Sequence, residues 1–174
     1  MTKKKARSSA RGMGRQDGSA LYRGLTVVCF AVLGWLTGQH LERGGGLAVV
    51  FAALGVLFGL LGLGVMGWIL DLSAPAARRT HGQGAIQGAV SRGFLLLLPF
   101  TVLALVAEVG LGWNTVQAFA SAGIMLAGAA VGAEMGKLEE GRPLLALAPA
   151  LAAAALAFAW MMVGLLAQWL GTVI

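Results

Sequence analysis

Residues 47–70 form a run of 24 residues without one charged side chain. A helix of about 20 apolar residues crosses the hydrocarbon core of a bilayer, and a slightly longer one crosses it with some tilt. Hydrophobic residues make up 58% of the chain, charged residues only 11%, and the mean hydropathy is +0.82. Soluble domains average roughly 45–50% apolar and 25% charged residues. The sequence therefore predicts an integral membrane protein.

The remaining apolar runs extend this prediction to an all-α, five-span transmembrane helical bundle. A flexible Gly44-Gly45-Gly46 segment separates the first two runs, and a longer loop with a proline and two arginines, residues 73–88, follows the second. Glycine and proline at such positions favour chain reversal over helix. We expect a single bundle over residues 22–171, with spans at about 22–41, 47–70, 89–111, 115–136 and 144–170.

The third span contains a proline and a stripe of polar side chains. Pro99 removes one backbone hydrogen bond and clashes with the preceding turn, which predicts a kink near residues 95–99. At about 100° per residue, four polar side chains fall within one arc of this helix. We expect that arc to face protein or water; it comprises Gln87, Ser91, Thr101 and Glu108.

The fourth span, within residues 114–136, is built almost entirely from small residues. Gln117, Ser121, Gly128 and Gly132 share one narrow face, and the opposite face is also mostly small. Since lipid provides no hydrophobic drive for helix association, close contact between small residues has to supply it. We interpret this helix as the centre of the bundle. The helix-packing residues predicted for the whole chain are Gly34, Gly38, Gly55, Gly59, Gly62, Ser121, Gly128, Gly132 and Gly136.

The glycine stripes have two interpretations. They pack the helices of a single bundle, which we favour, or they join copies of the chain into a homo-oligomer around a pore. A larger membrane complex with another protein is also compatible with them.

The whole formal net charge of +6 is concentrated in the first 23 residues. This segment lacks an apolar period and interleaved aromatic residues, so we expect residues 1–21 to be a disordered tail without a nucleic-acid-binding function. A basic tail beside a membrane helix is attracted to anionic lipid headgroups. The residues assigned to headgroup binding are Lys3, Lys4, Lys5, Arg7, Arg11, Arg15 and Arg23.

The distribution of basic residues predicts the orientation. With a cytoplasmic N-terminus, five spans leave only Arg43 of the 13 lysines and arginines on the outer side. This asymmetry follows the positive-inside rule and predicts an N-in, C-out topology. Short loops, glycine-rich spans and the basic tail are typical of a multi-pass protein of a bacterial inner membrane.

Few side chains offer chemistry within the predicted spans. His40 and His81 are expected on opposite sides of the bilayer, and Cys29 is the single cysteine. No hydrolase, metalloprotease or phosphate-loop motif is present. We therefore expect no catalytic residue, cofactor or metal site, and interpret the protein as non-enzymatic.

Carboxylates within a membrane are candidate functional groups, because an unpaired charge there is costly. Asp71 and Glu134 lie near span ends, where we favour a structural role at the interface. Glu108 lies deeper and shares the polar stripe with Thr101. The candidate ion or proton site therefore comprises Glu108, Thr101 and Glu134.

These observations predict a small scaffold, assembly or accessory subunit that acts through Gly- and Ala-packed intramembrane contacts. The alternative is a channel or transporter module for protons or cations that uses Glu108, with Glu134 as a possible second site.

Overall fold

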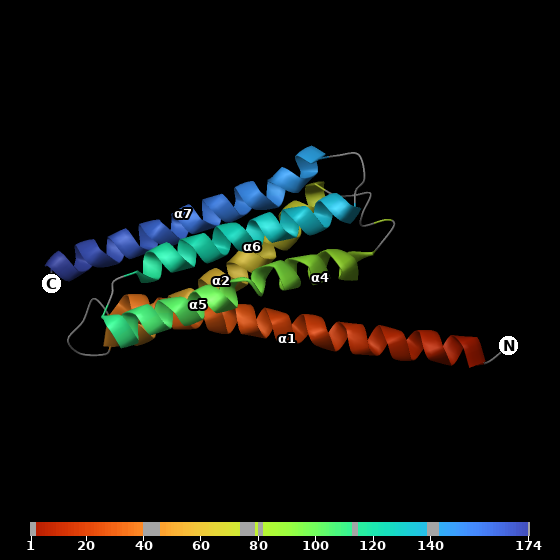
Figure 1. Ribbon diagram of the computed structural model, residues 1–174, viewed down its shortest axis with the longest axis horizontal. Coiled ribbons are helices and arrows are strands. Elements are labelled where there is room, and N and C mark those ends of the chain that lie inside the picture. Colours follow the sequence, from red (N-terminus) through yellow and green to blue (C-terminus); the bar gives the residue numbers. More distant parts are fainter. Residues whose placement is uncertain are drawn as a thin grey trace.

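The computed structural model describes residues 3–39, 46–73, 79, 82–112, 115–138 and 143–173. All secondary-structure elements within these residues are helices (Figure 1). They are α1 (Lys3–Gln39), α2 (Gly46–Ser73), α4 (Gln83–Phe94), α5 (Leu97–Leu105), the π-helix η1 (Val106–Gly110), α6 (Val116–Leu138) and α7 (Pro143–Val173).

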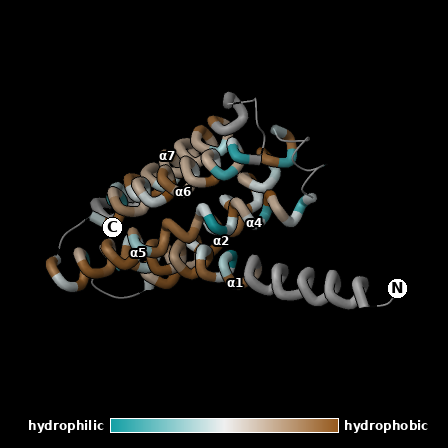
Figure 2. Tube along the Cα trace, turned by 45° about the vertical axis from the view of Figure 1, so that its right-hand side comes forward, coloured by the Kyte–Doolittle hydropathy of each residue, from teal (hydrophilic) through white to brown (hydrophobic). Residues whose placement is uncertain are grey.

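Five helical stretches in the described residues are long and apolar enough to cross a membrane: Ala20–Gln39, Gly46–Ser73, Gln83–Gly110, Val116–Lys137 and Leu147–Leu166. Their outer surfaces carry large exposed apolar side chains, such as Leu61 of α2 and Leu151 of α7. Hydrophobic residues run along all of these helices in Figure 2. Such a surface is expected of helices in lipid. The prediction of an all-α, multi-pass protein with five membrane-length helices is confirmed.

The second and third spans are longer than predicted, which shortens the loop expected over residues 73–88. Helix α2 continues to Ser73 and α4 begins at Gln83. Gly82 has a φ of 76°, and its carbonyl accepts a hydrogen bond from the Ala85 amide at 3.2 Å, which opens the first turn. Ile86 and Ala89 are then buried in the bundle. Burial of these two side chains explains why the helix starts before the apolar run does.

Helix α1 begins at Lys3, so the structure differs from the prediction of a disordered tail over residues 1–21. Extending an existing helix avoids the cost of nucleation. Residues 3–16 are rich in lysine, arginine and alanine and lack proline, and these residues have good helix propensity. The apolar first span therefore provides a template from which the helix continues toward the N-terminus.

Helix α6 is the most enclosed membrane-length helix. Half of its apolar window is buried, compared with 28–39% in the other four spans. It contacts α1, α4, α5 and α7, and Figure 1 shows it running beside α7. The prediction that the small-residue helix lies at the centre of the bundle is confirmed.

The other extensive interface joins α1 to α2. An aromatic cluster of Phe30, Phe58 and Trp160 links this pair to α7. The ring centroids lie 5.2–5.7 Å apart in tilted and edge-on arrangements, which favour contact between ring edges and faces. The middle of the bundle is therefore filled by bulky side chains.

The predicted interruption of the third span is confirmed. A turn at Leu95 and Leu96 separates α4 from α5. Pro99 has no amide hydrogen to offer the Leu95 carbonyl, which instead accepts the Leu98 amide at 3.0 Å. This tighter i to i+3 bond satisfies the carbonyl and lets the chain cross without an unpaired backbone group there.

Candidate functional site

Residues on the two predicted small faces of α6 meet different neighbours. A methyl group added at Gly128 would overlap the side chain of Ala153 on α7 and lie 2.9 Å from the Pro149 carbonyl oxygen. On the other side, a methyl group at Gly123 would lie 3.0 Å from Leu97 and Phe100 of α5. The backbone of α7 and the side chains of α5 therefore approach α6 to distances that only small residues permit.

The predicted glycines of α1 and α2 face one another. A methyl group on Gly34 would overlap the Phe51 carbonyl, one on Gly38 would lie 2.6 Å from the Ala48 Cα, and one on Gly55 would overlap the Phe30 carbonyl. Gly59 lies against the Phe30 ring. The backbones of α1 and α2 are thus in contact between Phe30 and Gly38 of α1 and between Ala48 and Gly55 of α2.

The remaining predicted packing residues have looser or less specific surroundings. Gly62 makes only an ordinary contact with Leu156 of α7. Ser121 and Gly132 are buried, and Gly136 is half-buried.

Two packing glycines were missed by sequence reasoning. A methyl group at Gly93 would overlap Val131 of α6, and one at Gly164 would overlap the side chain of Gln117. Neither glycine lies four residues from another glycine of its helix, so a four-residue repeat does not point to them.

We call the end of the bundle near Thr37 and Gln117 the Thr37 end. The Gln117 Nε2 atom donates to the Thr37 hydroxyl at 3.2 Å, and that hydroxyl donates to the Leu33 carbonyl at 2.9 Å. Buried nearby along α6 and α7 are three polar atoms that have no hydrogen-bond partner among the described residues: Gln117 Oε1, Ser121 Oγ and Trp160 Nε1. This end therefore contains the polar contact that joins α1 to α6.

The opposite end, which we call the Arg23 end, contains an ion pair. Arg92 of α4 and Glu134 of α6 approach to 2.7 Å between Nη2 and Oε2. Their side chains are 51% and 34% exposed, so the pair lies at the surface of the bundle. The structure thus gives Glu134 a basic partner, which fits a structural role at the interface.

Glu108 lies in the π-helix η1 and is half-buried. Gly112, with a φ of 67°, follows this helix and donates its amide to the Glu108 carbonyl at 3.1 Å. π-Helical turns recur at functional sites because they displace side chains from the regular helical register.

The three residues of the candidate ion site do not converge. Thr101 is buried and its hydroxyl donates to the Leu97 carbonyl at 2.9 Å within its own helix. Arg92, the partner of Glu134, precedes Glu108 by 16 residues, or about 24 Å along a helix at 1.5 Å per residue. Glu108 and Glu134 therefore lie near opposite ends of the bundle.

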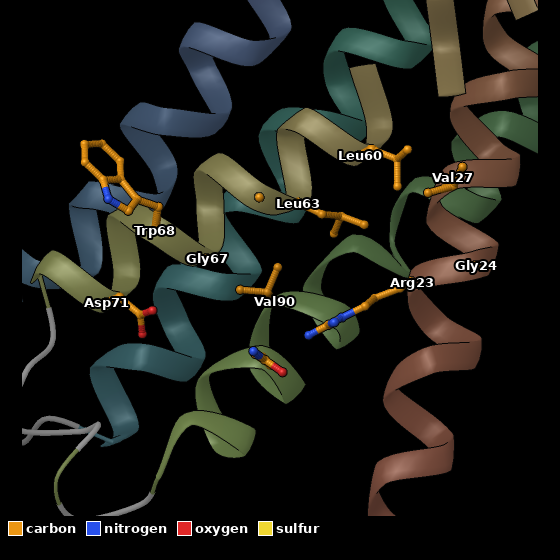
Figure 3. Close-up of a pocket in the computed structure, with 11 residues that line it drawn as sticks. Arg23, Gly24, Val27, Leu60, Leu63, Gly67, Trp68, Asp71 and Val90 are labelled. Carbon is orange, nitrogen blue, oxygen red and sulfur yellow. The ribbon is translucent and has the colours of Figure 1, made fainter. Parts of the chain in front are cut away.

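A groove of about 700 Å³ opens between α1, α2 and α4 at the Arg23 end (Figure 3). Its deeper walls are apolar, and its polar lining residues are Arg23, Asp71 and Gln87, with the indole of Trp68 alongside. None of its residues was singled out from the sequence as a pocket.

Within the described residues, no group of three or more His, Cys, Asp and Glu side chains is arranged to hold a metal ion. Cys29 is buried, and His40 and His81 lie outside the described residues. The headgroup-binding residues predicted from the sequence all lie in α1, and Arg23 is exposed.

The fold defines a multi-pass helical membrane protein with polar contacts at both ends of a tightly packed bundle. Comparisons of the chain with protein-family models, curated proteins and solved structures found no match.

Proposed function

We propose that this protein is a non-enzymatic scaffold, assembly or accessory subunit that acts through intramembrane helix contacts. The observation that carries the proposal is the unequal enclosure of its helices. Half of the α6 window is buried, but only 28% of those of α2 and α7. These two helices present broad apolar faces outward, including Phe158 and Leu165 of α7.

The arrangement of polar groups supports contact rather than transport as the primary role. Polar contacts lie at the two ends of the bundle, Gln117 with Thr37 and Arg92 with Glu134. Phe30, Phe58 and Trp160 pack together between them. A conducting path needs polar or hydrated lining at mid-depth, which this packing disfavours.

Photo-crosslinking in the native membrane tests the contact role. A photoreactive phenylalanine analogue replaces Phe158 on the exposed face of α7, and a matched variant replaces the buried Phe94. We expect a discrete adduct, with a second copy or another protein, from the Phe158 position only. Gentle extraction should then give a particle of matching mass. A lone monomer without adducts in both measurements would overturn the proposal.

We further propose an N-in, C-out orientation in a bacterial inner membrane, with the basic N-terminal segment against anionic headgroups. The charge asymmetry supports this orientation, and the two termini lie at opposite ends of the structure in Figure 1. Membrane-impermeant labelling of single cysteines in a Cys29→Ala background tests it. Labelling of residue 9 from outside intact cells, with residue 172 protected, would reverse the orientation.

A proton or cation transporter is the second candidate function. The observation that favours it is the position of Glu108 in the π-helix η1. Flux in proteoliposomes should fall strongly in Glu108→Gln if this carboxylate carries the ion, but not in the charge-matched control Asp71→Asn. Equal flux in wild type and Glu108→Gln would exclude that role for Glu108.

A further inference from the structure

The groove at the Arg23 end results from a divergence of α1 and α2. The two backbones touch where Gly34 meets Phe51 and where Gly55 meets Phe30. The glycines nearer the Arg23 end make no such contact. Methyl groups added at Gly24, Gly64 or Gly67 would have no atom within 4 Å. The two helices touch around Gly34 and Gly55, and Figure 1 shows them diverging toward the Arg23 end.

Helix α4 does not fill the resulting space. It contributes Gln87 and Val90 to the groove lining, alongside Val27 of α1 and Leu60 and Leu63 of α2. The deeper part of the groove is apolar. It is lined by Val27, Leu60, Leu63 and Val90, which lie nearer the middle of the spans than Arg23 and Asp71 do. Its volume of about 700 Å³ remains open beside glycines that present no side chain.

The mouth of the groove carries two opposite charges. Arg23 extends from α1 into the space between the helices, and Asp71 lies on α2 (Figure 3). Neither side chain has an ion-pair or hydrogen-bond partner within the described parts of the chain. Charges near the hydrocarbon region are costly unless they are paired or hydrated. The amide of Gln87 adds a group that both donates and accepts hydrogen bonds.

We propose that this groove binds one phospholipid with an ethanolamine headgroup. Arg23 binds the lipid phosphate through its planar guanidinium, and Asp71 accepts hydrogen bonds from the primary ammonium. An acyl chain lies along Gly64 and the side chains of Leu60 and Leu63. The order of groups in such a lipid, charges at one end and hydrocarbon at the other, matches the order of residues in the groove.

A partner transmembrane helix fits the groove less well. A transmembrane helix is about 10 Å in diameter and apolar around most of its circumference. Such a helix would place apolar side chains against Arg23 and Asp71 at the mouth. The lipid site is independent of the scaffold role, because a monomer holds the complete groove.

Native mass spectrometry of the purified full-length protein tests the proposal. The protein is exchanged into mixed micelles with equal amounts of phosphatidylethanolamine, phosphatidylglycerol and phosphatidylcholine that share the same acyl chains. We expect one phosphatidylethanolamine to be retained per protein, in roughly tenfold excess over phosphatidylcholine, whose quaternary ammonium has no N–H to donate to Asp71.

Variants separate the parts of the site. Arg23→Gln should reduce the retention of phosphatidylethanolamine roughly tenfold, since it removes the charge that binds the phosphate. Asp71→Asn should abolish the preference for phosphatidylethanolamine over phosphatidylglycerol. Gly64→Phe should block the acyl chain, because a side chain there enters open space. Matched controls are Lys137→Gln, which removes another exposed charge, and Leu61→Phe, which enlarges an exposed side chain of α2 outside the groove.

Helical circular dichroism of each variant checks that the bundle is intact. If Gly64→Phe does not fold, Gly67→Leu tests the same wall, and the exposed Arg23→Gln tests the charge without adding volume. Equal retention of the three lipids by the wild type would overturn the proposal. So would a preference for phosphatidylglycerol, or unchanged retention in both Arg23→Gln and the folded groove-filling variant. Copurification of a protein that Gly64→Phe displaces would assign the groove to a partner helix instead.

Discussion

The guanidinium of Arg92 on α4 faces the carboxylate of Glu134 on α6, with Nη2 2.7 Å from Oε2 and Nε 3.2 Å from both carboxylate oxygens. This geometry is close to a two-point pairing, which restricts the relative position of the third and fourth spans. At the membrane interface, where we expect this partly exposed pair to lie, water competes for both side chains and limits the stabilisation.

Removing either partner of this pair should have a small effect on stability. We expect Glu134→Gln and Arg92→Gln each to lower the free energy of unfolding by about 1 kcal/mol or less, with a coupling of about 0.5–1 kcal/mol between them. A double-mutant cycle by denaturant titration in detergent measures this coupling. A coupling near zero would show that the contact contributes nothing to stability.

Two glycines of α2 should respond to alanine with opposite signs. In a helix, alanine is favoured over glycine by up to about 1 kcal/mol. Gly64 has open space beside it, so Gly64→Ala should be neutral or stabilising. At Gly55 the added methyl group would overlap the Phe30 carbonyl, and forced separation of the helices should cost about 1–3 kcal/mol. Unfolding curves of the two variants compare them directly, and equal shifts would contradict the contact between α1 and α2.

The hydroxyl of Thr37 links two helices, whereas that of Thr26 does not. Thr37 accepts a hydrogen bond from Gln117 of α6, but Thr26 donates only to the Tyr22 carbonyl in its own helix. Thr37→Val leaves the Gln117 amide with an unmet donor, which costs about 1–3 kcal/mol. We expect it to be the more destabilising of the two valine variants in the same unfolding assay. The reverse order would place Gln117 in a different contact.

Trp160 should be needed for its bulk and not for its N–H group. The side chain is 2% exposed and packs against Phe30 and Phe58, but Nε1 has no hydrogen-bond partner in the described part of the chain. We expect Trp160→Phe to change stability by less than about 1.5 kcal/mol and Trp160→Ala to lower it by about 3–5 kcal/mol. A large loss in Trp160→Phe would reveal a hydrogen bond to the indole.

Much of the fold follows from the sequence because hydropathy and helix breakers act locally. Apolar runs located all five spans, Pro99 located the interruption at Leu95 and Leu96, and the small faces of residues 114–136 identified the central helix. Each of these features depends on one helix and its immediate surroundings.

Which faces meet was harder to predict. Lipid is as apolar as leucine, so an apolar face does not reveal whether it contacts lipid or protein. The pairing of Arg92 with Glu134 depends on the register between α4 and α6. In the same way, the contact of Gly164 with Gln117 depends on the register between α6 and α7. The groove depends on the angle between α1 and α2, which the positions of the glycines along the sequence do not indicate.

The two most extensive interfaces, α1 with α2 and α6 with α7, each join helices that are consecutive along the chain. Each pair therefore closes over a short loop, at little entropic cost, once its second helix has been synthesised. We expect the membrane protein to assemble from two preformed hairpins, with α4 and α5 docking between them last. A protease site inserted within residues 74–78 tests whether the first hairpin needs its covalent link to the rest: after cleavage in the membrane, the two fragments should remain associated, and their separation would show that the contacts between them do not hold the bundle together.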